Sequence, residues 1–410
     1  MANRAVGGKT RPPERKEQRN TQKKPNITGK IAKKFRLFSV RSGMDLPFLF
    51  LTLTLLVIGL VMLFSASYAN AYYRHGSSYY FISRQAAFAV LGVAAMIAVS
   101  YFDYHHFHKL AVPILIFSYM TLVLVLFTPR ISGVHRWISL GPLGQFQPSE
   151  VAKFGIIVVF AHLISLNFHR MNTFRYGVLP YLLILGGAAG LLILEPHVSA
   201  TIILVVLAGV MLFIGGIRLR WFAIAFSAAA AAVAYLVIFT QKFGYANDRI
   251  TAWLDPFSTA SKELMADTWQ TRQSLYAIGS GGLLGLGLGQ SRQKYLYLPE
   301  PQNDFIFAIV CEELGFIGAL IIIILFAMLV WRGITISLKA KDKFGMLLGI
   351  GLVVQVGLQV VLNIAVVTNT IPNTGISLPF FSYGGTSLVI LLAEMGVVLS
   401  ISRTSTIEKT

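Results

Sequence analysis

Asp304 is a candidate for acid–base chemistry because of where it stands in the chain. It directly precedes a long apolar run that starts at Phe305. A carboxylate at the edge of such a run loses solvation, which raises its pKa and suits a general base. An aspartate before an apolar run is also a common helix N-cap. The spacing alone leaves both interpretations open.

A second group of polar residues lies between residues 133 and 153. Pro148 suits the first turn of a helix, and Ser149 and Glu150 suit its N-terminus. Glu150 and Lys153 are three residues apart, so on a helix they share one face. Such a pair either lines a polar cavity or forms a neutral ion pair that locks two helices. The other polar residues considered in this group are Arg136, Trp137 and Gln147.

A third polar stretch, residues 241–303, contains Arg249, Lys294 and Glu300. Its glycine run at 279–289 could bind phosphate through backbone N–H groups. No predicted strand precedes this run, so a nucleotide site is disfavoured. We expect instead a loop that packs closely against the membrane or a partner.

A fourth stretch, residues 363–387, combines glycine and proline with the polar residues Thr374, Ser382 and Tyr383. This composition is typical of a broken helix or re-entrant segment. Such segments occur at membrane depth only where the backbone is buried in protein or lines a water-filled cavity.

These polar stretches are embedded in a very apolar chain. Of 410 residues, 55% are hydrophobic and 13% are charged, and the mean hydropathy is +0.67. Soluble proteins carry about 25% charged residues, and a single water-soluble core stops growing near about 250–300 residues. The composition therefore predicts a membrane protein. The single cysteine, Cys311, excludes an intramolecular disulfide.

Ten apolar runs are long enough to cross about 30 Å of hydrocarbon, and in lipid such runs must be helices. Lys and Arg concentrate in alternate short connections, which places both termini in the cytoplasm. Four polar stretches then lie on the outer side, where we expect function: 129–153, 195–200, 241–304 and 363–387. The runs lie near 46–67, 84–101, 109–128, 149–167, 177–194, 198–217, 221–240, 304–331, 345–367 and 384–402.

The sequence therefore predicts an all-α polytopic membrane protein in three parts. Residues 1–44 form a basic tail with 13 Lys and Arg against two Glu, and this tail is predicted to be disordered and cytoplasmic. Its charge favours attraction to anionic lipid, with partner docking as an alternative and nucleic-acid binding disfavoured. Residues 45–403 form the ten-helix domain, with a large outer loop at 241–303, and residues 404–410 form a second cytoplasmic tail.

The motifs together resemble one family. The run Pro372–Ser387 reads P-x-T-G-x-x-L-P-F-x-S-Y-G-G-T-S and resembles the signature of the SEDS proteins (shape, elongation, division and sporulation). The RW-I-LG, QPSE-xx-K, GSGGLLG and LPE-xxx-DFIFA blocks are similar to theirs, in the same order over residues 44–402. The long basic tail favours the division-type branch, FtsW, over the elongation-type RodA, and a sporulation-type relative stays open.

The sequence departs from the family pattern at three places. Asn303 stands where Thr is common, and Thr386 stands where Ser is common. Glu195, Pro196 and His197 replace a frequent Pro-Asp pairing, which leaves His197 without an assigned role.

The resemblance implies a peptidoglycan glycosyltransferase that polymerises lipid II at the outer face of the bacterial cytoplasmic membrane. It further implies a class B penicillin-binding protein as transpeptidase partner, other divisome proteins, and a location at the division septum. The family's essential aspartate falls on Asp304, predicted to be catalytic. The residues predicted to bind substrate are Arg136, Trp137, Gln147, Ser149, Glu150, Lys153, Arg249, Lys294, Glu300, Thr374, Ser382 and Tyr383.

The α-linked donor and β-linked product require inversion in a single displacement, with Asp304 deprotonating the acceptor hydroxyl. The leaving diphosphate needs cations near it. The sequence shows no metal-ligand cluster, and a divalent cation such as Mg²⁺ or Mn²⁺ on the diphosphate stays open. Two alternatives are a lipid II flippase, suggested by Glu312, Gln355 and Gln359 deeper in the spans, and a non-catalytic division scaffold.

Overall fold

The computed structural model describes residues 43–130, 133–141, 144–224, 227, 253–257 and 262–404. Within these ranges the chain is mostly helical, with irregular segments at 282–305 and 368–384 and one two-stranded antiparallel sheet. The helices are α2 (Leu46–His75), α3 (Tyr80–Tyr101), α4 (His105–Lys109), α5 (Ala111–Leu126), α6 (Pro148–Asn167), α7 (Leu179–Leu194), α8 (Val198–Ile214), α11 (Lys262–Gly281), α12 (Ile306–Leu338), α13 (Lys343–Val367) and α14 (Gly385–Thr404). The strands are β1 (Ile138–Ser139) and β2 (Gln145–Phe146), and short η2 (Phe168–Arg170) and η3 (Phe174–Val178) turns link α6 to α7.

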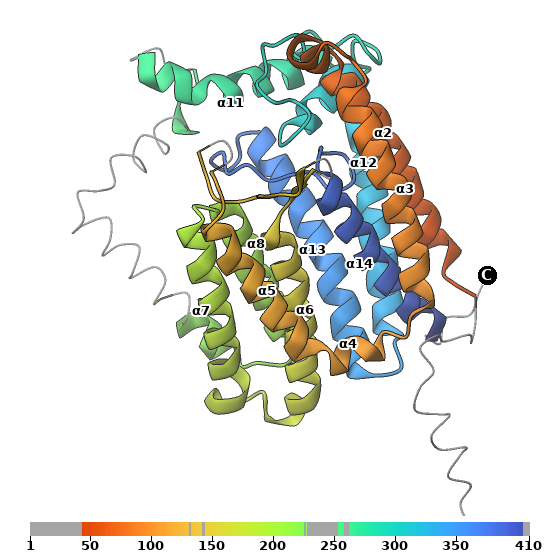
Figure 1. The fold of residues 1–410 in the computed structure, drawn as a ribbon, viewed down its shortest axis with the longest axis vertical. Helices are drawn as coiled ribbons and strands as arrows, with labels where there is room; N and C mark the ends of the chain where they lie inside the picture. The colour runs from red at the N-terminus through yellow and green to blue at the C-terminus, as the bar shows by residue number, and fades with distance from the viewer. Residues whose placement is uncertain are drawn as a thin grey trace, which may run out of the picture. The chain divides into compact units, whose positions relative to one another are not determined.

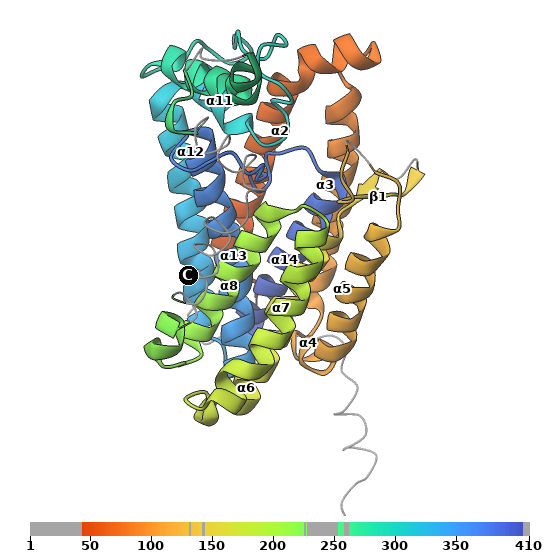
Figure 2. The ribbon, with the colours of Figure 1, turned by 90° about the vertical axis from the view of Figure 1, so that its left-hand side faces the viewer.

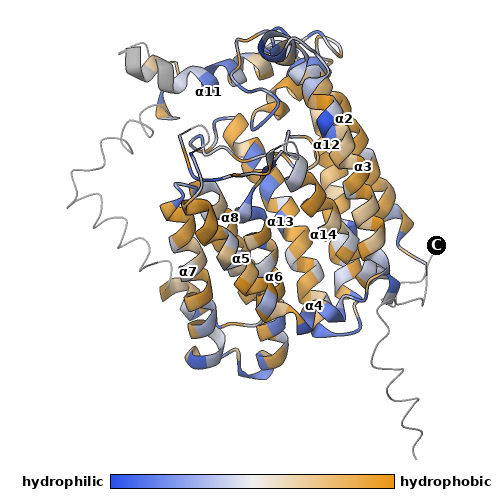
Figure 3. Ribbon diagram, in the orientation of Figure 1, coloured by the Kyte–Doolittle hydropathy of each residue, from blue (hydrophilic) through white to orange (hydrophobic). Residues whose placement is uncertain are grey.

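The described helices agree with the predicted polytopic membrane fold. Seven of them are long and apolar enough to cross a membrane, and α5 and α8 are shorter apolar helices. Nine of the ten predicted spans are thus helical in the described part of the chain. The remaining predicted span, 221–240, lies almost entirely outside the described residues, as do the tails at 1–42 and 405–410. In Figure 3, hydrophobic residues dominate these helices, and hydrophilic residues gather toward their ends.

The span helices run side by side, with α14 packed against α3 and α13 packed against both α12 and α6 (Figures 1 and 2). Close packing depends on small residues, as is usual between membrane helices. Gly396 of α14 faces Met96 of α3, where a Cβ would lie 2.5 Å from the Met96 carbonyl oxygen. By contrast, α11 is much less hydrophobic than the span helices, and it lies across one end of the bundle (Figure 1).

Helix starts are fixed by aspartates at the opposite end of the bundle. Asp45 accepts a hydrogen bond from the Phe48 N–H at 3.0 Å and caps α2. The same carboxylate pairs with Arg332 of α12 at 2.8 Å. Asp342 caps α13 by accepting from the Gly345 N–H at 2.8 Å. These caps satisfy N–H groups that a helix start leaves free.

The glycine run packs against the chain's own helix α12. At Gly315 the backbone of α12 breaks, with φ of 67°. The segment 282–287 enters this break, where Leu286 N–H donates to Glu312 O at 3.0 Å and Phe316 N–H donates to Gly282 O at 2.9 Å. A Cβ at Gly315 would lie 2.2 Å from the Gly285 nitrogen. Glycine is required because two backbones touch there.

The connection between α13 and α14 is irregular and buried, as predicted for a re-entrant segment. Phe380 and Phe381 are almost fully enclosed. Gly59, midway along α2, faces this segment, and a Cβ there would lie 2.4 Å from the Phe380 carbonyl oxygen. The segment therefore enters the helical bundle instead of passing over it.

The predicted orientation can be tested by labelling with a membrane-impermeant maleimide in intact cells. Ser77 lies exposed between α2 and α3, at the end that we place outside, and Lys341 lies exposed between α12 and α13, at the end that we place inside. The native Cys311 is buried and gives a low background. Ser77→Cys should be labelled and Lys341→Cys should be labelled only after the membrane is opened. The reverse pattern would invert the topology.

Candidate functional site

A cavity of about 510 Å³ opens at the end of the bundle where α2 meets α3 and α12 begins. Charged, aromatic and amide side chains from most of the predicted polar stretches line it. Of the predicted site residues, the lining includes Arg136, Trp137, Gln147, Glu150, Lys153, Glu300, Asp304, Ser382 and Tyr383. The fold thus brings together residues that are up to 247 positions apart in the sequence.

Asp304 lies half-buried in the wall of this cavity, two residues before α12. The N-cap position of α12 is Phe305, with no side-chain capping bond, so Asp304 does not act as the helix cap. Burial raises the pKa of the Asp304 carboxyl to about 6; the Arg136 charge opposes this rise and the Glu300 charge adds to it. At neutral pH the group is therefore largely ionised and can accept a proton.

Glu150 and Lys153 form an ion pair within α6 that lines the cavity, and this pair does not join two helices. The Lys153 ammonium lies 2.8 Å from the Glu150 carboxylate, on the first turns of α6. The Lys153 side chain is only 2% exposed, and both residues line the cavity. A buried charge needs such a partner. The pair therefore supplies a fixed cation and anion at the cavity wall.

Arg136 is a cation whose charge acts on several ionisable groups of the site. It lies just before β1, and its guanidinium donates to the carbonyl oxygen of Pro196. Its charge also acts on the carboxyl of Asp304, on Glu195 and on His197. A cation in this position can stabilise an anion bound in the cavity.

The loop between α7 and α8, where the sequence departs from the family, lies beside Arg136. Glu195 is completely buried, which raises the pKa of its carboxyl to about 8 although the Arg136 charge opposes this rise. His197 lines the cavity, and burial lowers its pKa to about 3, with the charges of Arg136 and Lys153 acting in the same direction. At neutral pH His197 is therefore a neutral polar group of the cavity wall.

Glu300 connects the cavity wall to α2. It pairs with Arg74 at 2.5 Å and accepts a hydrogen bond from the Gln302 amide at 2.7 Å. It also accepts from the Asn303 amide at 3.3 Å, so Asn303 retains a polar contact at the position where the family commonly has Thr. Thr386 donates to the Gln145 carbonyl oxygen at 2.6 Å and keeps the hydroxyl donor of the commoner Ser.

Sequence analysis missed the part of the cavity wall that comes from α2 and α3. Arg84 lies over the Tyr80 ring at 4.3 Å, and Phe81 packs edge-on against Tyr383 with 4.9 Å between ring centres. From the sequence, Arg74 and Arg84 stand only as basic residues of a short connection between two predicted spans. The clustering of aromatic residues with Arg beside the turn at Gly76 was the available signal. Further lining residues from this part are His75 and Phe88.

Three predicted substrate-binding residues lie outside the cavity lining, and one cannot be placed. Ser149 is buried in α6, and the Thr374 carbonyl oxygen accepts from Ser199. Lys294 is buried in an ion pair with Glu313, so its predicted contact with substrate stays a prediction. Arg249 lies outside the described residues.

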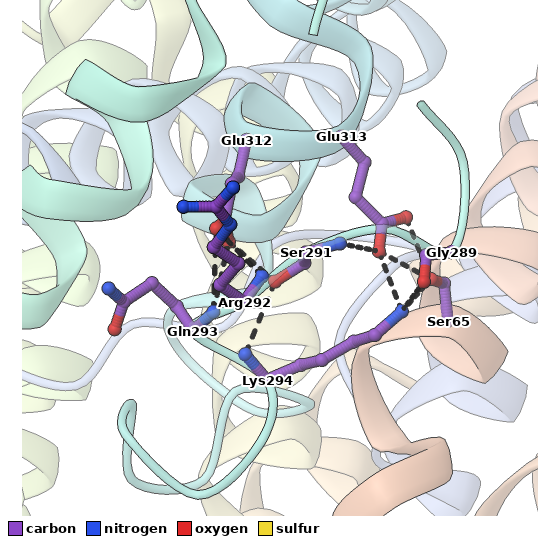
Figure 4. Close-up of polar contacts among 8 residues, drawn as sticks. All are labelled: Ser65, Gly289, Ser291, Arg292, Gln293, Lys294, Glu312 and Glu313. Atoms are coloured by element: carbon purple, nitrogen blue, oxygen red, sulfur yellow. Dashed lines mark hydrogen bonds and ion pairs between the residues drawn. The ribbon is translucent and has the colours of Figure 1, made fainter. Parts of the chain in front are cut away.

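Lys294 belongs to a polar clamp, which we define as Ser65, Ser291, Lys294, Glu312 and Glu313 (Figure 4). The Lys294 ammonium lies 2.9 Å from the Glu313 carboxylate, and both side chains are no more than 1% exposed. The Ser65 hydroxyl donates to the same carboxylate at 2.7 Å. The clamp thus joins α2, α12 and the loop after the glycine run.

The neighbouring Glu312 holds the backbone of that loop. Its carboxylate accepts from the Ser291 hydroxyl and from the Arg292 N–H, the latter at 2.9 Å (Figure 4). Both adjacent carboxylates are therefore occupied within the protein. Two other polar residues had suggested transport. Of these, Gln355 donates to Glu394 at 3.0 Å, and Gln359 lines the cavity.

Among the described residues, no group of three His, Cys, Asp or Glu side chains is arranged to hold a metal ion. Of the three carboxylates that line the cavity in the described ranges, Glu150 is paired with Lys153 and Glu300 with Arg74, which leaves Asp304. The donor set in this part of the chain does not fit a resident divalent cation.

Fold and site together define a polytopic membrane protein with a charged cavity at one end of its helical bundle. Residues 46–407 match the family model described as cell cycle protein, which comprises FtsW, RodA and SpoVE. The chain belongs to this family, the SEDS family that its motifs resemble.

Relatives of several kinds are similar to the chain over most of its length. Stage V sporulation protein E of Bacillus subtilis is 40% identical over 369 residues, which cover 89% of this chain and 98% of the relative. The probable peptidoglycan glycosyltransferase FtsW of Geobacter sp. (strain M18) is 38% identical over 364 residues, covering 88% and 97%. A sporulation-type and a division-type relative are thus nearly equal in sequence identity to this chain.

Solved structures agree with this assignment. A chain from a peptidoglycan synthase complex, described in terms of coordinated polymerization and crosslinking, superposes with a TM-score of 0.72 at 26% identity, covering 88% of this chain and 98% of that one. The crystal structure of RodA from Thermus thermophilus superposes with a TM-score of 0.64 at 26% identity, covering 89% and 99%.

The clamp makes a prediction about stability. Lys294→Ala should leave the buried Glu313 carboxylate without its cation and reduce the free energy of unfolding by about 3–5 kcal/mol, the range for breaking a buried ion pair. Arg74→Ala breaks the exposed pair with Glu300 and should cost no more than about 1 kcal/mol. Thermal unfolding in detergent compares the two. Equal effects would contradict the structural role of Lys294.

Proposed function

We propose that this chain polymerises lipid II by an inverting single displacement in which Asp304 is the general base. The chain is a peptidoglycan glycosyltransferase, the activity named for its FtsW relatives. The observation that supports the mechanism is the placement of a half-buried carboxylate, of raised pKa, in the wall of a cavity that also contains Arg136 and Lys153.

In the proposed step, the C4 hydroxyl of the acceptor saccharide attacks the anomeric carbon of the donor. The new C–O bond forms as the bond from the anomeric carbon to the diphosphate oxygen breaks. The hydroxyl proton passes to the Asp304 carboxylate, and the undecaprenyl diphosphate leaves with the bonding electron pair. One base is sufficient, because the leaving group carries its own negative charge and needs cations instead of a proton.

Arg136 and Lys153 are proposed to bind the diphosphate. They are the cations, among those predicted from the sequence, that line the cavity within the described residues. Lys153 is held by Glu150, and Arg136 is held by the Pro196 carbonyl, so both are oriented before substrate arrives. A Mg²⁺ or Mn²⁺ ion, if the reaction uses one, would arrive bound to the diphosphate of the substrate.

A class B penicillin-binding protein is the proposed partner, because a structural relative belongs to a complex that coordinates polymerization and crosslinking. The similarity to FtsW proteins supports other divisome proteins as further partners and the division septum of a bacterial cell as the location. The apolar helices make the chain a multi-pass membrane protein.

Replacement of the proposed base is the first test. Asp304→Asn should fold and insert normally, yet polymer from lipid II should fall to background in an assay of purified protein with a class B penicillin-binding protein. The amide has nearly the same shape but takes up no proton. Polymerisation at the wild-type rate would rule out Asp304 as the base. Loss of protein from the membrane would point to a structural role.

The pH dependence of the wild-type rate is a second test. Because Asp304 must be ionised and its pKa is about 6, kcat/KM should fall about tenfold per pH unit below about pH 6. Glu300→Gln removes a negative charge that raises this pKa. The fall in kcat/KM on the acidic side of the pH profile, here called the acidic limb, should therefore move to lower pH. Arg136→Gln removes the opposing positive charge, so the limb should move to higher pH. Shifts in the opposite directions would contradict the assignment.

A further inference from the structure

The short segment that contains Asp304 is held by its backbone, at three carbonyl oxygens in a row. The Tyr383 N–H donates to Gln302 O at 2.8 Å. The Ser382 hydroxyl donates to Asn303 O at 2.6 Å. The Asn363 side-chain amide donates to Asp304 O at 2.7 Å. All three donors come from the end of α13 and from the re-entrant segment that follows it.

Of these three donors, Asn363 is the one whose nitrogen donates to two carbonyl oxygens. Its side chain is completely buried near the end of α13. Besides its bond to Asp304 O, the same amide nitrogen donates to Ile376 O at 2.6 Å. Both amide hydrogens are therefore used to join the backbone before α12 to the backbone of the re-entrant segment. Such a double donor has a fixed geometry that a hydroxyl or an aliphatic side chain does not reproduce.

Two neighbours complete the arrangement. Ser382 accepts from the Leu378 N–H at 2.8 Å, so one hydroxyl joins both segments. Gly375 has φ of 67°, and a Cβ there would lie 3.0 Å from Asp304 Oδ2. The absence of a side chain at Gly375 leaves space for the Asp304 carboxylate beside the re-entrant backbone.

We propose that Asn363 is a positioning residue for glycosyl transfer, which acts by fixing Asp304 against Gly375 and the re-entrant segment. Because Asn363 lies outside the cavity lining, its effect passes through the Asp304 backbone. The proposal rests on the proposed role of Asp304 as the base. It gives the re-entrant segment a specific task, which is to set the position and burial of one carboxylate.

Asn363→Leu is the variant that tests this, because it keeps the side-chain size, removes both donors and adds no charge. A displacement of about 1 Å at a catalytic group can cost about 100-fold in rate. We therefore expect kcat for lipid II polymerisation to fall at least about tenfold, with KM changed by less than about threefold. The acidic limb of the pH profile should also move to lower pH, because a displaced Asp304 carboxyl is less buried.

Gln355→Leu is the matched control. Gln355 is a buried amide on the same helix, and its donor bond goes to Glu394 and not to the Asp304 segment. It should lower the thermal unfolding midpoint about as much as Asn363→Leu, while kcat and the acidic limb stay within about twofold and about 0.2 pH units of wild type. Equal kcat values and equal acidic limbs for the two variants would overturn the proposal.

Ser382→Ala and Ser382→Thr serve if Asn363→Leu fails to fold. Ser382→Ala should reduce kcat and move the acidic limb to lower pH, and Ser382→Thr should restore both because it keeps the bridging hydroxyl. An unshifted acidic limb in Ser382→Ala would contradict the positioning account. Asp304→Asn, assayed alongside, separates the two claims. If it is active, the proposed function fails; if it is inactive while Asn363→Leu matches Gln355→Leu, only the positioning role fails.

Discussion

Irregular backbone within a membrane protein must have its hydrogen bonds satisfied internally, and the rest of this structure depends on that constraint. Two irregular segments meet it here in different ways. The glycine run pairs with the break at Gly315, and carboxylates from α12 accept from N–H groups of the loop that follows the run. The segment between α13 and α14 donates to the carbonyl groups before α12, through Asn363 and Ser382. Each segment is therefore fixed against α12, at the helix that Asp304 precedes.

The electrostatics of the cavity follow from this arrangement. Asp304 is buried enough to hold its proton more tightly than a free aspartate, yet Arg136 keeps the carboxyl largely ionised at neutral pH. The Glu150 carboxylate offsets the free-energy cost of burying the Lys153 ammonium. The proposed base thus lies on the α12 side of the cavity, and the cations proposed to bind the diphosphate lie on the α6 and β1 side.

Much of this could be predicted from the sequence, for identifiable reasons. Apolar runs of span length made the helices predictable, and the spacing of Glu150 and Lys153 predicted their shared face. The ion pair of Lys294 could not be predicted, because a buried lysine and a substrate-binding lysine look alike in sequence until the partner Glu313, 19 residues away, is placed. The wall from α2 and α3 was missed because Arg84 and Phe81 approach Tyr383 only through tertiary packing. Asn363 lies within an apolar helix, and its role depends on two carbonyl groups from other segments.

The most direct test of the central claim is the single-turnover rate of glycosyl transfer from lipid II already bound to the protein. This measurement separates chemistry from binding and from the contribution of a partner. If Asp304 is the base, Asp304→Asn should bind lipid II within a few-fold of wild type while the transfer rate falls by at least about 100-fold. An unchanged transfer rate, or a loss of binding with the transfer rate preserved, would contradict the account.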